Sequence, residues 1–335
     1  RKTVVLFLHE KRKGKPNLAQ KLDMKLVKKI TATFLVIIVV FLLGGYFYFQ
    51  KKFTPPENYL KVIGIAENIE MKWISSNENS HSALLLPVKF KGIDSIFYMQ
   101  FDSGSAITVF YKNSLESIAE KFPNQIKMNS EKNKISTAFK IGNMNIFSET
   151  FEILNYGEIV NFDDPKAENI IGTIGTDLLE KRIIILDFKN NQLSFIEKIK
   201  EENFTNFEFK KRKILIPSIL ENENLKLLYD TGTSGYELIT TKEIWQKYRT
   251  KNSAIKTEKG NSWGNTLSVY SASAKKKIQF EKTILNLSEV TYIEGTSALQ
   301  KFLMKRSGMQ GMIGNKIFFN HKLILDCKNE KFKLE

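Results

Sequence analysis

The stretch Phe97–Phe110, FYMQFDSGSAITVF, places a carboxylate, Asp102, in a segment that is otherwise rich in apolar and aromatic residues. Such a run predicts a buried β-strand that ends at Asp102. A carboxylate beside a core is costly unless it is hydrogen-bonded or used. The small residues that follow it, Ser103–Ser105, predict a tight loop. We therefore regard Asp102 as a candidate functional residue.

The same pattern returns in the second half of the chain. Residues 84–110 and 214–239 each contain a short apolar strand with a proline, a polar turn, a second apolar strand, and then an Asp-Ser/Thr-Gly-Ser/Thr quartet. The quartets are DSGS at Asp102–Ser105 and DTGT at Asp230–Thr233. Both strand pairs predict β-hairpins.

The similarity continues beyond the quartets. The segments GTIGTDLLEKRIIILDFKNNQLSF and GMIGNKIFFNHKLILDCKNEKFKL each contain a glycine, Gly175 or Gly314, twelve residues before a strand-ending Asp. Self-similarity over this length indicates a duplicated unit. We therefore predict an all-β, or mostly β, protein built from a duplicated unit, with an N-terminal lobe over residues 82–197 and a C-terminal lobe over residues 198–335.

Most of the positive charge precedes the lobes. Lys and Arg outnumber Asp and Glu by 51 to 36 over the 335 residues, and twelve basic against two acidic residues up to Lys52 supply +10 of the net +15. A nucleic-acid binder would carry its basic residues within the folded part, so we expect no nucleic-acid partner. The single cysteine, Cys327, excludes an intrachain disulfide.

The uncharged run 31–49, TATFLVIIVVFLLGGYFYF, is about long enough to cross a bilayer as a helix. The lysines before it favour a cytoplasmic N-terminus. We expect a basic cytoplasmic leader over 1–30, an uncleaved transmembrane signal anchor over 31–49, and a tether or stalk over 50–81. The lobes would then lie outside the cytoplasm, in a periplasmic or extracellular space. A buried core helix is the alternative interpretation of this run.

Two questions about this N-terminal part stay open from the sequence. The natural start is either Arg1 or Met24, because MKLVKKI from Met24 has the form of a short basic leader. Residues 53–81 could be a pro-segment or a simple stalk.

The two quartets resemble the active-site signature of aspartic proteases of the pepsin/retropepsin type. TIG ending at Gly175 and MIG ending at Gly314 resemble the apolar-apolar-Gly element that crosses behind the catalytic loop in that family. The resemblance covers about residues 82–335, and each half is closer in length to a bacterial retropepsin-like domain than to a pepsin lobe. It implies a bilobal fold of two β-barrel-like lobes, with a cleft that binds an extended peptide or protein substrate, in a monomeric catalytic unit.

The resemblance implies an aspartic endopeptidase in which Asp102 and Asp230 activate one water molecule, with no metal and no cofactor. Two neighbouring carboxylates cannot both ionise, so they share one proton. The ionised one acts as general base and the protonated one as general acid. The sequence leaves open which Asp carries the proton at rest.

The resemblance also assigns roles to the residues that follow each Asp. Gly104 and Gly232 would allow the tight loops, and the hydroxyls of Ser103 and Thr231 would bond across to the opposite loop. The hydroxyls of Ser105 and Thr233 would donate to the outer carboxylate oxygens. Because such a bond lowers a carboxyl pKa, we expect activity skewed to mildly acidic pH.

The flap is where this sequence departs from the family. Family members cover the cleft with a hairpin that usually carries an aromatic in the first lobe, but residues 128–142 contain no Tyr or Trp. In the second lobe, NSWGNTLSVY over 261–270 places Trp263 and Gly264 at a plausible hairpin tip. We hypothesise that the second lobe provides the flap, and the alternative is that Trp263 is partly buried packing.

Three functions other than peptide hydrolysis are alternatives for this sequence. A non-catalytic, membrane-tethered peptide-binding module on the same fold is the main alternative. Calcium binding is disfavoured because the quartets lack the closely spaced additional carboxylates of a calcium loop. A dinucleotide site is disfavoured because GTIGTD does not have Gly-x-Gly-x-x-Gly spacing.

Overall fold

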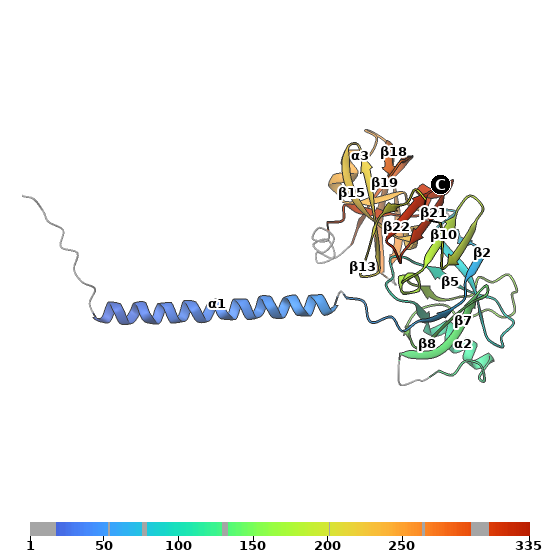
Figure 1. The fold of residues 1–335 in the computed structure, drawn as a ribbon, viewed down its shortest axis with the longest axis horizontal. Helices are drawn as coiled ribbons and strands as arrows, with labels where there is room; N and C mark the ends of the chain where they lie inside the picture. The colour runs from blue at the N-terminus through green and yellow to red at the C-terminus, as the bar shows by residue number, and fades with distance from the viewer. Residues whose placement is uncertain are drawn as a thin grey trace, which may run out of the picture. The chain divides into compact units, whose positions relative to one another are not determined.

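The structure is a computed structural model that describes residues 18–52, 54–75, 79–128, 133–200, 202–262, 265–295 and 308–335. The chain forms two compact units, Arg1–Thr54 and Pro55–Glu335. Figure 1 shows the helix of the first unit and the strands of the second.

The first unit contains one helix, α1, over Leu18–Lys52. Its sequence has no proline between these bounds, whereas Pro55 and Pro56 follow shortly after its end. Among the described residues, no helix is both long and apolar enough to pass through a membrane. The transmembrane anchor that we predicted over 31–49 is not supported by this finding.

The second unit is mostly β-sheet, as predicted, and its first large sheet has eight strands. These strands are β1 (Lys61–Ile63), β3 (Lys72–Ile74), β4 (Ala83–Phe90), β5 (Phe97–Phe101), β6 (Val109–Tyr111), β7 (Lys134–Ile141), β8 (Met144–Leu154) and β9 (Ile170–Ile174). Pairing runs β4–β5–β9–β6–β8–β7 and returns to β4, which closes a barrel-like ring. Helix α2 (Lys112–Lys121) buries Leu115 and Ile118 from one face.

The second large sheet repeats this arrangement. Its strands are β13 (Glu208–Lys210), β14 (Lys213–Leu220), β15 (Glu223–Tyr229), β16 (Leu238–Thr240), β17 (Ile255–Ser262), β18 (Asn265–Phe280), β19 (Thr283–Glu294) and β20 (Gly311–Ile313). The ring here is β14–β15–β20–β16–β19–β18 and back to β14. In each ring the strand before the quartet pairs in parallel with the strand that ends in the Ile-Gly element. The two sequence copies therefore fold with the same strand order.

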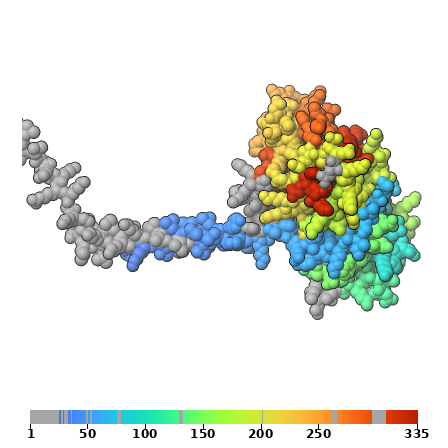
Figure 2. Space-filling view, viewed as in Figure 1, coloured from blue at the N-terminus to red at the C-terminus, as the bar shows by residue number. Residues whose placement is uncertain are grey.

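A six-stranded sheet joins the two copies. Its strands are β2 (Ala66–Glu70), β10 (Ile183–Asp187), β11 (Gln192–Ile196), β12 (Thr205–Asn206), β21 (Lys322–Asp326) and β22 (Lys331–Leu334). β10 and β21 are antiparallel, with Ile185 opposite Ile324, its counterpart in the other repeat. A local two-fold relation between the copies follows from this self-pairing. Figure 2 shows the yellow-green and red segments of the two copies meeting on one face.

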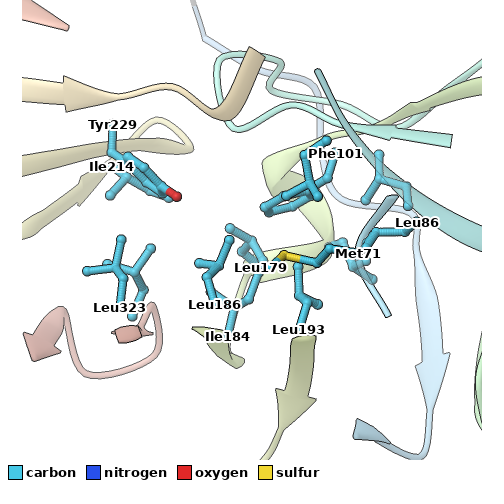
Figure 3. Close-up of a cluster of buried hydrophobic side chains, with 14 of the residues drawn as sticks. Met71, Leu86, Phe101, Leu179, Ile184, Leu186, Leu193, Ile214, Tyr229 and Leu323 are labelled. Carbon is cyan, nitrogen blue, oxygen red and sulfur yellow. The ribbon is translucent and has the colours of Figure 1, made fainter. Parts of the chain in front are cut away.

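The core reaches the strands that carry the quartets. β5 alternates between buried and half-buried residues, so that Phe97, Met99 and Phe101 face inward. Phe101, next to Asp102, is 1% exposed, and Tyr229, next to Asp230, is 0% exposed. Figure 3 shows the aromatic side chains of Phe101 and Tyr229 directed into one layer of aliphatic side chains that includes Leu186 from β10 and Leu323 from β21. The residues before the two aspartates are thus anchored in one apolar cluster.

The tether predicted over 50–81 is wrong for residues 61–74, which contain three paired strands. β1 pairs with β8, β2 with β11, and β3 with β4. Ala66 and Met71 are 1% and 2% exposed. These strands have only three to five residues each, so their pattern is too short to distinguish from a stalk without their partners.

We predict that residues 55–75 cannot be removed as a dispensable pro-segment. Deleting them should lower the free energy of unfolding by at least about 3 kcal/mol, because Met71 alone contributes about 1.5–3 kcal/mol of burial and three strand pairings are lost. Urea denaturation of residues 76–335 against residues 55–335 measures this. Equal midpoints and slopes would show that the segment is a stalk after all.

Candidate active site

Asp102 and Asp230 come together from the ends of equivalent strands. The backbone N–H of Asp102 donates to the carbonyl of Ile174 at 3.0 Å, and that of Asp230 donates to Ile313 at 2.9 Å. These bonds extend the β5–β9 and β15–β20 pairings by one residue. The two carboxyl groups are hydrogen-bonded to each other, and both aspartates are half-buried, with some surface open to solvent.

The glycines of the two quartets allow this approach. A β-carbon on Gly104 would lie 2.7 Å from Oδ1 of Asp230, and one on Gly232 would lie 2.7 Å from Oδ1 of Asp102. Each glycine therefore faces the aspartate of the opposite loop, where no side chain fits. The backbone N–H of each glycine also bonds to the aspartate of its own loop. Gly104 N–H donates to Asp102 Oδ1 at 2.8 Å, and Gly232 N–H donates to Asp230 Oδ1 at 2.9 Å.

Ser103 and Thr231 tie the two loops together by reciprocal hydrogen bonds. The Ser103 hydroxyl donates to the carbonyl of Tyr229 at 2.9 Å and accepts from Thr231 N–H at 2.9 Å. The Thr231 hydroxyl donates to the carbonyl of Phe101 at 2.7 Å and accepts from Ser103 N–H at 2.8 Å. Both side chains are 0% exposed. This is the cross-bonding between loops that the resemblance implies.

The roles expected of the Ser105 and Thr233 hydroxyls are wrong. Ser105 Oγ donates to the carbonyl of Ile107 at 2.9 Å, and Thr233 Oγ1 donates to the carbonyl of Asp230 at 2.8 Å. Both hydroxyls thus stabilise their own turns, where a main-chain carbonyl is within reach. The Ser105 backbone N–H, not its hydroxyl, donates to Asp102 Oδ1 at 3.2 Å. The basis for an acid-skewed activity is therefore removed.

Gly175 and Gly314 lie directly behind the two loops. A β-carbon on Gly175 would lie 2.4 Å from the backbone of Ile107, and one on Gly314 would lie 2.0 Å from the carbonyl of Thr233. The Ile-Gly elements therefore pack against the quartet loops with no room for a side chain. This close packing explains why glycine occurs at both positions.

Sequence reasoning missed a set of buried polar side chains under the loops. Asp177, 5% exposed, accepts from the N–H and the hydroxyl of Thr108, each at 2.7 Å. Under the other loop, Tyr229 donates its hydroxyl to Asn315 at 2.6 Å, and Asn315 donates to Ser234 at 2.8 Å. The available signal was that polar residues directly follow both Ile-Gly elements, in GTD and GNK.

The surroundings of the pair raise both carboxyl pKa values. Burial, followed by the charge of Asp102, raises the pKa of Asp230 to about 8. Burial also raises the pKa of Asp102, but hydrogen bonds from Gly104 N–H, from Asp230 and from Ser105 N–H oppose this shift. These opposing hydrogen bonds favour the ionised form of Asp102, whereas the charge of Asp102 favours the protonated form of Asp230.

The hairpin β17–β18 contacts the loop that follows Asp230. Its strands pair as far as Ser262 opposite Asn265. The Tyr236 hydroxyl, six residues after Asp230, donates to Oε1 of Glu258 on β17 at 2.5 Å. Trp263 and Gly264, our candidate flap residues, lie outside the described residues.

No protein-family model matches the chain, and no curated protein matches it significantly. Within the described ranges, no group of three or more His, Cys, Asp or Glu side chains comes together that could hold a metal ion.

We predict that the hydroxyls of Ser103 and Thr231, which bond between the two loops, contribute more to the free energy of unfolding than the hydroxyl of Ser105, which bonds within its own turn. Ser103→Ala and Thr231→Ala should each lower the free energy of unfolding by about 1–3 kcal/mol, because each leaves a buried N–H and a buried carbonyl unpaired. Ser105→Ala is the matched control and should cost less, since its hydroxyl is half-buried and bonds only within its own turn. Urea denaturation of the three variants measures the difference, and equal losses would contradict it.

Proposed function

We propose that this protein is an aspartic endopeptidase of the pepsin/retropepsin type. The observation that carries the proposal is the hydrogen-bonded pair of Asp102 and Asp230, brought together by two copies of one fold and partly exposed to solvent. Two carboxyl groups that share a proton are a known arrangement for activating water against a peptide carbonyl.

The geometry supports the following mechanism. Asp102, the ionised partner, removes a proton from a water molecule that attacks the scissile carbonyl carbon, while protonated Asp230 donates a hydrogen bond and then its proton to the carbonyl oxygen. The tetrahedral diol collapses when Asp230 takes back a hydroxyl proton and Asp102 delivers its proton to the leaving nitrogen. The C–N bond breaks, and the carboxyl pair returns to one shared proton.

The substrate in this proposal is an extended peptide. An extended chain can add β-type hydrogen bonds in a groove beside paired strands. The hairpin β17–β18 is the candidate cover, and its contact between Tyr236 and Glu258 supports a flap in the second repeat. Placement of these domains outside the cytoplasm stays a prediction from the charge pattern of residues 1–49.

A non-catalytic peptide-binding module on the same fold is the second candidate. Such a module has no need of a buried carboxyl pair, which raises the pKa of both groups and therefore stores unfavourable electrostatic energy. The presence of both aspartates with both facing glycines favours the enzyme.

The direct test is replacement of each carboxylate. Asp102→Asn and Asp230→Asn should each lower kcat for peptide hydrolysis by at least about 10³-fold, since each removes a proton-transfer group but keeps the volume. A peptide library incubated with wild type and variants, with and without EDTA, measures this. Thermal melts check that the variants are folded. Hydrolysis at the wild-type rate by either variant would contradict the proposal. Loss of wild-type hydrolysis in the presence of EDTA would contradict it as well.

The pH dependence follows from the two carboxyl groups. Activity needs one protonated and one ionised carboxyl, so kcat/KM should fall as pH rises through about 8, where Asp230 loses its proton. It should also fall on the acid side, where Asp102 becomes protonated. The pKa of Asp102 is raised above its ordinary value of 3.8, so this loss begins at a higher pH than for a free aspartate. A kcat/KM profile from pH 3 to 10 tests this. A rate still rising at pH 10 would be inconsistent with the shared proton.

A further inference from the structure

The turn between β13 and β14 contains two residues in an unfavourable backbone conformation. Lys211 and Arg212 have φ of +52° and +59°, and the flanking residues Lys210 and Lys213 are paired. A two-residue hairpin turn with both φ values positive strongly favours Asn-Gly. Residues with a β-carbon are less favourable there, and contacts of the Arg212 side chain can offset this cost.

The Arg212 side chain is buried beneath the first Asp loop, which we define as residues 102–108. It is 4% exposed, whereas Lys211 beside it is exposed. Its Nη1 donates to the carbonyl of Ala106 at 3.1 Å, and its Nε donates to Oε1 of Glu180 at 2.7 Å. A side chain from the start of the second repeat thus holds the loop of the first repeat.

A second contact from the same turn supports this arrangement. The carbonyl of Arg212 accepts from Oγ1 of Thr176 at 2.7 Å, and the same hydroxyl lies 2.9 Å from the carbonyl of Ser105. Oε2 of Glu180, the other carboxylate oxygen, accepts from Asn58 at 2.8 Å. The guanidinium is therefore held by two acceptors, and the Arg212 backbone and the Glu180 carboxylate are each fixed by a further hydrogen bond.

The first repeat makes the corresponding contact with the second Asp loop, residues 230–236. Asn79 lies in the connection between β3 and β4, the counterparts of β13 and β14. Its Nδ2 donates to the carbonyl of Gly235 at 2.9 Å. A β-carbon on Gly235 would collide with this amide, at 1.7 Å. Each repeat thus donates a side-chain hydrogen bond to the C-terminal part of the other repeat's Asp loop.

We propose that Arg212 and Asn79 are reciprocal positioning residues, each of which fixes the Asp loop of the opposite repeat. The proposal rests on the proposed peptidase function for its kinetic readout. Neither side chain need touch substrate. Because the loop ends are held by the other repeat, the separation of Asp102 and Asp230 depends on how the two repeats are docked. Arg212 suits this role because its planar fork donates to two acceptors in fixed directions, which a lysine ammonium does not.

The test compares the same substitution at two neighbouring positions of the full-length chain. Arg212→Gly and Lys211→Gly both relieve a left-handed residue in one turn, so their difference reports the Arg212 side chain alone. We expect Arg212→Gly to lower kcat about 10- to 100-fold with KM within about 2-fold, and to speed hydrogen exchange of the amides in 103–108. Lys211→Gly should change neither. Arg212→Lys should fall between wild type and Arg212→Gly in both.

The outcomes separate this proposal from the proposed function. If Arg212→Gly matches Lys211→Gly in kcat and in amide exchange, the positioning role is overturned. If the wild type cleaves no peptide, the peptidase proposal fails, and the exchange rates of 103–108 still decide whether Arg212 holds the loop. Should Arg212→Gly not fold, Arg212→Lys carries the same comparison, and wild-type kcat and exchange in that variant would overturn the proposal.

Discussion

The reciprocal hydrogen bonds between Ser103 and Thr231 are the constraint on which the site depends. Each hydroxyl accepts from the opposite backbone N–H and donates to the carbonyl of the residue before the opposite aspartate. A hydroxyl can do both at once, whereas an amide nitrogen or a carboxylate oxygen cannot. Because both side chains are fully buried, these bonds have no water to compete with them, and breaking one exposes two unpaired polar groups to an apolar interior. The two loops are thereby fixed to each other directly, and the meeting of Asp102 and Asp230 follows.

The sequence allowed the duplicated architecture to be predicted because its signals were long and repeated. Two hairpins, two quartets and two Ile-Gly elements at matching positions define a unit that cannot be mistaken for chance. A two-fold relation between such units brings equivalent residues together, so the proximity of the two aspartates could be anticipated. The strands β1 to β3 could not, because three to five residues without a partner carry no readable period. Their partners, such as β8 and β11, lie far along the chain.

The hydroxyls of Ser105 and Thr233 show a second limit of sequence reasoning. Both residues match the family pattern, but a serine or threonine side chain bonds whichever acceptor its rotamer reaches first. Here each finds a main-chain carbonyl of its own turn. The choice is decided by local backbone angles, which no motif encodes. The contact of the Arg212 side chain with the first Asp loop could not be predicted from the sequence either. A basic residue in a Lys-rich connection gives no sign that its side chain turns inward beneath a loop of the other repeat.

The two halves have the same strand order, but the surroundings of their two carboxyl groups differ. Asp102 accepts hydrogen bonds from two N–H groups of its own loop, Gly104 and Ser105. Asp230 accepts from Gly232 in its own loop and has a further hydrogen bond from the backbone of Gly104 in the opposite loop, while the charge of Asp102 opposes its ionisation. Hydrogen-bond donors stabilise an anion, whereas burial and a neighbouring negative charge destabilise it, so a pair this close holds one proton. In the mechanism we propose, Asp102 is the base and Asp230, whose pKa is raised to about 8, is the acid.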